Sequence, residues 1–337
     1  MTLRRFTMPP MLLFLCLVLA PAQAREVTDM AGRTVTVPEH VHGIYAMSHS
    51  LAIVTALAPD LLVGLPFPFK RNPEAERYLP ARYASLPQLD GNLEQLKALA
   101  PDFALGWTTP AFVRDRVGQF DRIALPTVLV DVDRQEQYPA TFRFLGRLLK
   151  REERAEALAS HLERLMTETA AMVAAIPQER RLRVYYAESV DGLTSQCDSS
   201  DRSDVILRGG GINALHCSNP LTPADNMPVD QETLLAADPD VIVTRFAQTA
   251  RAIVADPRWA QVRAVRTGRV YAVPALPFNW FDRPPSFMRA LGARWLFEQL
   301  YPDHATGTLA EETRRFYQQF FNLRLDEEDL GRILARP

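Results

Sequence analysis

The chain has 337 residues, 47% of them hydrophobic, and its 38 Lys and Arg against 40 Asp and Glu give a formal net charge of −2. At roughly 150 residues per domain, this length favours two domains, and the composition is ample for two apolar cores. The near-neutral charge, without a block of basic residues, argues against a nucleic-acid partner.

The N-terminus has the pattern of a secretory signal. Arg4 and Arg5 precede an apolar run at 11–19, and small residues at 22–24 would suit cleavage. We predict that residues 1–24 are a cleavable signal peptide and that the mature protein is periplasmic. No later apolar run reaches the roughly 20 residues of a membrane span, so none is expected.

Residues 25–150 alternate strand and helix patterns. Alternating apolar and polar residues at 26–37 surround a glycine and predict a hairpin. Further strands are expected at 44–47, 62–65, 102–106 and 127–130, and helices at 50–57, 92–100 and 110–119. Such alternation predicts a mostly parallel sheet covered by helices.

One long amphipathic helix is predicted from about 152 to 176, because apolar residues recur there every three or four positions. At 1.5 Å per residue it would span roughly 37 Å. Pro177 ends the pattern. We expect residues 151–177 to link the first lobe, 25–150, to a second lobe, 178–337.

The second lobe repeats the alternation. Strands are expected at 183–186, 240–244 and 269–273, and helices at 201–208, 257–263 and 285–300. Two terminal helices, near 308–321 and 325–334, carry alternating charge and are expected to pack on the outside. The predicted fold class is α/β, with two similar lobes joined by one long helix and a ligand cleft between them.

A repeated segment supports two similar lobes. Residues 94–105 and 232–243 both read Glu, Leu two positions later, Ala, then Pro-Asp and an apolar run. A short helix closed by proline and followed by a buried strand is one α/β step. The helix dipole favours Glu94 and Glu232 in such first turns, which is a sufficient structural reason for their presence.

Candidate ligand residues follow the predicted strands, because open α/β sheets bind ligands beyond their carboxyl ends. They are Ser48, His49, Ser50 and Trp107 in the first lobe, and Arg245, Trp280 and Arg283 in the second. His49 is a tentative metal ligand, since imidazole commonly binds metals, although a lone histidine is more often structural. Trp280 and Arg283 suit an aromatic or anionic ligand, and the alternative is a packed loop.

Two cysteines, Cys197 and Cys217, lie in one segment of the second lobe. An exported chain permits a disulfide between them, and two separate thiols are the alternative. Their spacing is not that of a zinc site.

Several phrases carry a family resemblance. They are DMAGR at 29–33, GGGIN at 209–213 and GRVYAV at 268–273, together with the two Glu…Pro-Asp steps. The chain thereby resembles the periplasmic binding proteins of the cobalamin and ferric-siderophore type. The resemblance implies a monomeric substrate-binding protein without a cofactor, which delivers a metal chelate, such as an iron-siderophore, haem or cobalamin-like molecule, to an ABC permease dimer with its ATPase. It also implies that Glu94 and Glu232 dock against the permease.

Other functions stay open on the residues alone. A bare oxyanion could be held by Ser48, Ser50 and helix amides, and a nickel or cobalt complex could use His49. A periplasmic hydrolase is disfavoured because the sequence has no G-x-S-x-G elbow and no H-E-x-x-H helix, so we expect no enzyme. A receptor that signals to a membrane partner is the remaining alternative.

Overall fold

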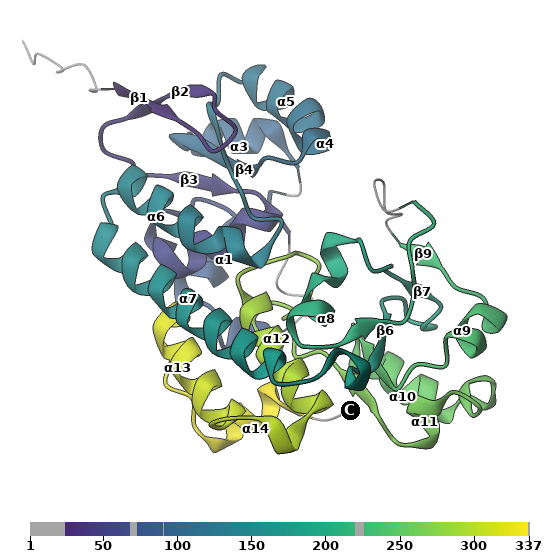
Figure 1. Ribbon diagram of the computed structural model, residues 1–337. Coiled ribbons are helices and arrows are strands. Elements are labelled where there is room, and N and C mark those ends of the chain that lie inside the picture. The colour runs from purple at the N-terminus through teal and green to yellow at the C-terminus, as the bar shows by residue number, and fades with distance from the viewer. Residues whose placement is uncertain (1–23, 68–72, 90, 220–225, 336–337) are drawn as a thin grey trace, which may run out of the picture.

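The computed structural model describes residues 24–67, 73–89, 91–219 and 226–335. Figure 1 shows two α/β lobes, with helix α7 (Glu152–Ala174) running between them. The parallel sheets of the lobes are separate, one of three strands and one of four. The expected signal peptide lies outside the described residues, apart from Ala24 at the start of β1.

The first lobe is built on a parallel sheet in the order β3, β4, β5, preceded by the predicted hairpin. Its strands are β1 (Ala24–Thr28), β2 (Thr34–Pro38), β3 (Ile44–Ala46), β4 (Phe103–Trp107) and β5 (Thr127–Val130). Its helices are α1 (Ser48–Leu57), α2 (Pro73–Glu76), α3 (Leu93–Leu99), α4 (Pro110–Phe112), α5 (Gly118–Asp121) and α6 (Tyr138–Leu149), with a π-helical stretch (Val113–Val117) between α4 and α5. The strand expected at 62–65 is reduced to two isolated bridges, Leu62 with Ile44 and Leu65 with Gln88, because its two ends pair with different segments.

The aspartate of the DMAGR phrase fastens the hairpin to the sheet. Asp29 is 4% exposed, and its carboxylate accepts hydrogen bonds from the Arg33 guanidinium at 2.7 Å and the Leu129 amide at 3.2 Å. Leu129 belongs to β5, so this phrase has a structural role.

The second lobe is built on a parallel sheet in the order β11, β10, β6, β8. Its strands are β6 (Arg183–Ala187), β8 (Ile212–Asn213), β10 (Val241–Thr244) and β11 (Val270–Ala272), with an antiparallel pair β7 (Thr194–Ser195) and β9 (Met227–Pro228) beside it. Its helices are α8 (Asp204–Arg208), α9 (Gln231–Ala237), α10 (Ala247–Ala255), α11 (Arg263–Arg266) and α12 (Met288–Leu300).

One hydrophobic core crosses both lobes. It includes Ile44 of β3 and Val184 of β6, and it continues into α13 (Leu309–Phe321) and α14 (Glu327–Ile333). The terminal helices were expected to pack on the outside, but α13 is exposed on one face only. Its other face contacts α1, α7 and α12, and Phe316 and Phe320 on that face are 0% and 1% exposed. Separating the lobes widely would expose this shared core, which limits hinge motion.

The two halves of the sequence repeat are built alike. Asn92 caps α3 by accepting from the Gln95 amide at 3.0 Å, and Asp230 caps α9 by accepting from the Thr233 amide at 2.7 Å. Both helices end in a left-handed residue before the proline and lead into β4 and β10. In the described part of the chain, no helix combines the length and the apolar character that a membrane span requires.

Candidate functional site

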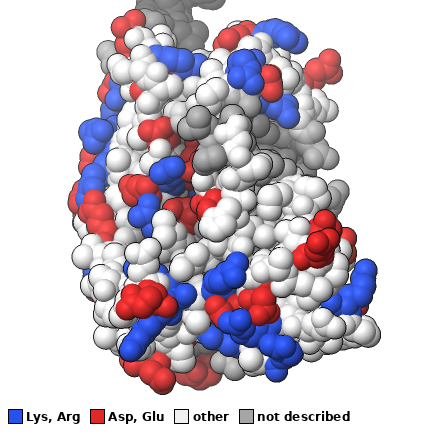
Figure 2. Space-filling view, turned by 45° about the vertical axis from the view of Figure 1, so that its right-hand side comes forward, with Lys and Arg blue, Asp and Glu red and all other residues white. Residues whose placement is uncertain are grey.

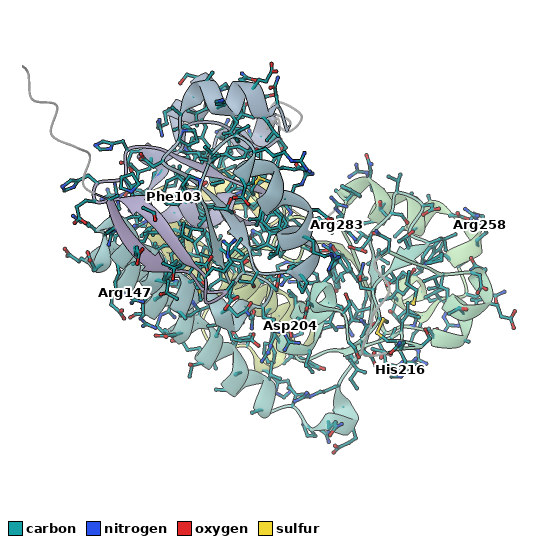
Figure 3. All side chains as sticks on the ribbon, turned by 90° about the horizontal axis from the view of Figure 1, so that it is seen from above. Phe103, Arg147, Asp204, His216, Arg258 and Arg283 are labelled. Atoms are coloured by element: carbon teal, nitrogen blue, oxygen red, sulfur yellow. A yellow bond between two sulfur atoms is a disulfide. The ribbon has the colours of Figure 1, made fainter. Side chains whose placement is uncertain are left out.

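Residues that follow the strands of the two lobes come together at their junction. His49, in the first turn of α1, is within reach of the charges of Arg202 and Arg289 from the second lobe. Arg289 also donates a hydrogen bond to the Asp133 carbonyl of the first lobe. Figure 3 shows Arg283 at this junction, with Arg258 and His216 farther out in the second lobe. The interlobe site consists of His49, Trp107, Glu188, Arg202, Asp282, Arg283 and Arg289.

His49 presents a neutral ring to this site. Its ring stacks on that of Trp107, with centroids 4.0 Å apart and planes 15° from parallel. Burial, and then the charge of Arg202, lower the pKa of His49 to about 4, although Asp282 opposes the shift. Among the described residues, its Nδ1 atom has no hydrogen-bond partner. A neutral imidazole whose second nitrogen carries no proton and has no partner can accept a hydrogen bond or bind a metal through that nitrogen.

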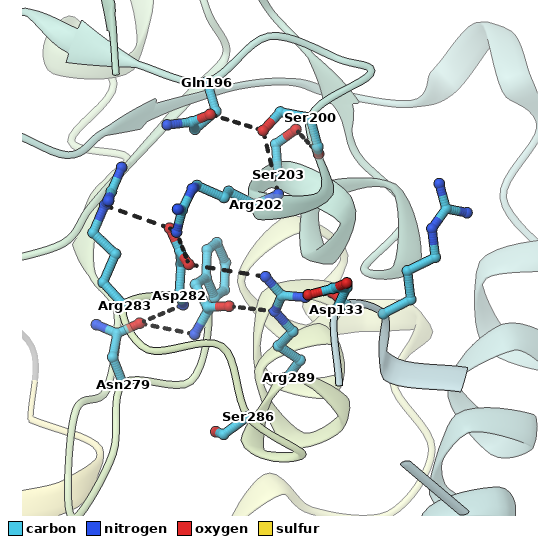
Figure 4. Close-up of polar contacts among 12 residues, drawn as sticks. Asp133, Gln196, Ser200, Arg202, Ser203, Asn279, Asp282, Arg283, Ser286 and Arg289 are labelled. Carbon is cyan, nitrogen blue, oxygen red and sulfur yellow. Dashed lines mark hydrogen bonds and ion pairs between the residues drawn. The ribbon is translucent and has the colours of Figure 1, made fainter. Parts of the chain in front are cut away.

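Three arginines surround one buried carboxylate. Asp282 is 0% exposed and lies 3.1 Å from Arg202, 3.6 Å from Arg283 and 3.9 Å from Arg289 (Figure 4). Arg289 is itself 1% exposed and donates to the Phe281 carbonyl at 2.8 Å. One carboxylate cannot neutralise three guanidinium groups, so positive charge remains at this position.

A second buried acid orients Arg283. Glu188 follows β6, is 3% exposed and accepts from Arg283 Nε at 2.9 Å. The backbone of Arg283 is left-handed, with φ of +58°, which aims its side chain toward Glu188 at some conformational cost. Glu188 and Asp282 offset two of the three arginine charges of the interlobe site, and the Asp133 carboxylate of the first lobe offsets part of the third, since its charge interacts with that of Arg289. A partly desolvated site with excess positive charge favours an anion.

Arg245 lies at the margin of this site. It follows β10, and its guanidinium carbon is 4.8 Å from the centroid of the Phe246 ring. The charges of Arg245 and Arg283 both act on the Tyr186 hydroxyl, whose pKa burial raises well above its usual value. Arg245 is therefore near the interlobe site without belonging to its hydrogen-bonded centre.

Two sequence-predicted ligand residues are corrected by the structure. Ser50 is 0% exposed, and its hydroxyl donates to the Gly106 carbonyl at 3.1 Å, so it joins α1 to β4. Trp280 is also 0% exposed and packs so closely on α12 that a Cβ on Gly292 would lie 2.2 Å from the Trp280 carbonyl oxygen. Neither side chain is available to a ligand. Ser48, by contrast, is half-buried in the first turn of α1.

Sequence reasoning missed Arg202 and Arg289. Arg202 lies in a short 3-10 helix, Asp201–Ser203, and Arg289 in the first turn of α12, so neither directly follows a strand of a sheet. A basic residue just inside a largely apolar helix was the available signal for Arg289. Arg202 had no comparable signal.

No protein metal centre accompanies His49. Within the described residues, no group of three or more His, Cys, Asp or Glu is placed to hold a metal ion. Cys197 and Cys217 form a disulfide, with an S–S distance of 2.00 Å, in the segment that carries Arg202.

The two glutamates of the repeat are exposed in equivalent positions. Glu94 lies in the first turn of α3 and Glu232 in the first turn of α9, one in each lobe (Figure 1). Within the described residues, neither carboxylate has a hydrogen-bond or ion-pair partner. Figure 2 shows basic and acidic side chains intermingled on the described surface facing the viewer, as the near-neutral charge predicts.

Known proteins resemble this chain in sequence and in fold. A family model described as periplasmic binding protein matches residues 68–276. An ABC transporter solute binding protein from Sulfurospirillum deleyianum is 34% identical, with a TM-score of 0.84, over 92% of this chain and 98% of its own.

Two further relatives have named ligands. The molybdate-binding protein MolA of Haemophilus influenzae is 21% identical over 91% of this chain and 94% of MolA. Its molybdate-bound structure has a TM-score of 0.75. CeuE of Helicobacter pylori, solved as a complex with nickel and histidine, has a TM-score of 0.72 at 13% identity, over 93% of this chain and 100% of its own. At these identities the structural likeness supports the fold and not the ligand.

Proposed function

The chain belongs to the family of periplasmic binding proteins, and from that premise we propose that its interlobe site captures a small oxyanion. It is the solute-binding component of an ABC importer and not an enzyme, and such proteins work in the periplasm with a permease and an ATPase. The family has no cofactor of its own, so the solute is the only ligand to identify.

The excess positive charge of the interlobe site carries this proposal. Arg202 and Arg283 keep 27% and 19% of their side chains exposed, whereas Asp282 is fully buried behind them. An oxyanion offers several acceptors to such guanidinium forks, in charge-assisted hydrogen bonds. Helix α1 adds a positive dipole end beside His49, since its first turn holds no acidic residue and no side-chain cap.

The relative with a named oxyanion ligand supports the same class. MolA binds molybdate and resembles this chain along nearly its whole length. We therefore take a tetrahedral dianion such as molybdate or tungstate as the first ligand to test. The neutral His49 ring would donate its N–H to an oxygen of that anion.

A metal chelate is the second candidate, favoured by His49 itself. Its neutral ring, stacked on Trp107 and with an open Nδ1, could bind the metal of an iron-siderophore, haem or cobalamin-like molecule, or of a nickel or cobalt complex. The arginines would then hold carboxylates of the chelate. The oxyanion is preferred because it can bind to both partly exposed arginines, Arg202 and Arg283, whereas a large planar chelate needs more aromatic wall than Trp107 and its neighbour Phe112 provide.

We also propose that Glu94 and Glu232 dock the loaded protein, acting as a monomer, on the two halves of the permease. Their equivalent positions in two similar lobes would present paired acceptors to arginines. Their lack of partners within the described residues leaves both carboxylates free for that contact.

Calorimetric titration of the purified protein tests the ligand class. Molybdate, tungstate, sulfate and phosphate are compared with ferric citrate and a nickel–histidine complex. We expect saturable binding of at least one dianion, weakened tenfold or more in Arg202→Ala. Tight binding of a chelate without binding of any oxyanion would replace the first candidate by the second.

A further inference from the structure

We propose that the Cys197–Cys217 disulfide is a positioning element of the interlobe site: it fixes the turn that presents Arg202 and thereby sets the affinity for an anion. The affinity part of this inference rests on the proposed function. Arg202 reaches Asp282 from a turn, 197–203, that is not paired to either parallel sheet.

The turn is built on the backbone of one of the bridged cysteines. The Cys197 carbonyl accepts hydrogen bonds from the Ser200 amide at 3.1 Å and from the Ser203 hydroxyl at 2.8 Å. Arg202 lies between these two serines in the sequence. Cys197 itself is 1% exposed, so its position determines where the turn begins and how Arg202 is aimed.

Gln196, the residue before Cys197, links the turn to a second arginine, Arg283. Gln196 donates to Glu188 at 2.5 Å and accepts from the Ser200 hydroxyl at 2.8 Å. Glu188 in turn holds Arg283. Figure 4 shows the line of contacts from Gln196 through Ser200 to the arginines around Asp282. The turn therefore touches both of the partly exposed arginines that face a ligand.

The other cysteine ties this turn to the sheet. Cys217 follows β8, the edge strand of the second sheet. Without the disulfide, the turn would keep the hydrogen bonds of Asp198 with the Leu215 carbonyl at 3.0 Å, the Cys217 amide at 3.0 Å and the His216 ring at 2.6 Å. It would also keep the bond of Asn213 with the Gln196 carbonyl at 3.0 Å. A single such bond contributes only about 1 kcal/mol net, so the turn would sample other conformations.

Loss of the crosslink should lower affinity through this sampling. A dithiol reductant would cleave the S–S bond to two thiols and itself become a cyclic disulfide, so two electrons and two protons pass to the protein. If the turn then presents Arg202 only a tenth of the time, the apparent dissociation constant rises about tenfold. The cluster of apolar side chains around Tyr185 and Trp259 includes neither cysteine and should persist, although Cys197 itself is buried.

A double-mutant cycle separates positioning from general stabilisation. Molybdate affinity is measured for the oxidised protein, for Cys197→Ala with Cys217→Ala, for Arg202→Ala, and for the three changes together. We expect the cysteine variant to bind about tenfold more weakly, with a clearly smaller further loss, transmitted through Gln196 and Glu188 to Arg283, when it is added to Arg202→Ala. The same cysteine changes added to Trp107→Ala should keep their tenfold effect. Unchanged affinity in the cysteine variant, or an undiminished loss on top of Arg202→Ala, overturns the proposal.

Hydrogen exchange tests the positioning without a ligand. In the cysteine variant, amides of the described residues 198–206 should exchange at least tenfold faster, while β6 and β10 keep their protection. If the oxidised protein binds none of the anions, the proposed function is wrong. Hydrogen exchange would still show whether the disulfide fixes the turn that carries Arg202. Unchanged exchange at 198–206, or equal loss of protection in β6 and β10, would show that the bridge only stabilises the lobe or does nothing there.

Discussion

The His49 ring lies nearly parallel to the Trp107 ring, with centroids 4.0 Å apart, so the indole covers one face of the imidazole. A positive imidazolium would gain a cation–π contact in this position. Burial and the nearby arginines nevertheless dominate, since the pKa of His49 falls to about 4. The ring is therefore neutral at the pH of most growth conditions, and protonation would oppose folding.

This pKa predicts that acid destabilises the protein through His49. The unfolded chain takes up the proton near pH 6.5 and the folded chain only near pH 4, so the contribution is complete above about 6.5 and is lost as the pH falls between those values. At pH 5 the loss should be about 2 kcal/mol. Urea unfolding at pH 7 and pH 5 measures it, with His49→Gln as the control that lacks the titration. An equal pH dependence in both proteins would contradict the buried neutral ring.

Removal of Arg283 should weaken anion binding without unfolding the protein, provided that Glu188 is neutralised too. Arg283→Ala alone leaves the buried Glu188 carboxylate without its cation, which costs several kcal/mol. The pair Arg283→Ala with Glu188→Gln avoids this cost. We expect its molybdate affinity to fall tenfold or more, with a melting temperature close to that of the parent.

A matched control removes an ion pair of the same kind elsewhere in the second lobe. Arg258 is exposed, pairs with its own neighbour Asp256 at 2.6 Å and lies on the far side of the second lobe (Figure 3). Arg258→Ala with Asp256→Asn should leave affinity within about twofold, because screening weakens a charge at that distance. Equal losses in both double variants would mean that removal of any Arg–acid pair from the second lobe weakens binding, and that the place of Arg283 in the interlobe site does not matter.

Much of the fold could be predicted from the sequence because the repeat and the strand–helix alternation reflect local chemistry. Helices α6 and α10 are the longest of those that were not predicted, and the reasons differ. Helix α6 has a clear apolar period in its buried residues Tyr138, Phe142 and Leu145, although no helix was predicted there. Helix α10 buries Ile253 as its one large apolar residue, so its stripe is weak, and the helix expected at 257–263 breaks into short turns around Pro257.

The interlobe site was only partly predictable, because a position after a strand does not fix where a side chain points. His49, Trp107 and Arg283 are in the site, whereas Ser50 and Trp280 turn into the core. Arg202 and Arg289 reach it from elements of the second lobe that do not follow strands. Their role depends on how the lobes meet, which no local pattern encodes.

Ser50→Ala tests the corrected role of that serine. The buried hydroxyl donates only to the Gly106 carbonyl, so its loss should reduce the free energy of unfolding by about 1 kcal/mol and leave anion affinity unchanged. Denaturant unfolding and calorimetric titration measure the two quantities. A large loss of affinity at unchanged stability would return Ser50 to the ligand site. Ser48→Ala serves as the comparison, because that side chain is half-buried in the same turn.

The docking proposal predicts a loss of transport without a loss of binding. Glu94→Ala with Glu232→Ala removes two exposed carboxylates that are not part of the interlobe site, so affinity should stay within about twofold. Uptake through the cognate permease in proteoliposomes should fall at least tenfold, since both arginine contacts are lost. Glu153→Ala with Glu311→Ala is the matched control, because these acids are also exposed in the first turns of their helices, α7 and α13. Normal uptake by the Glu94 and Glu232 variant would mean that both carboxylates only stabilise the first turns of their helices. Equal uptake defects in the test pair and the control pair would indicate a nonspecific effect of charge.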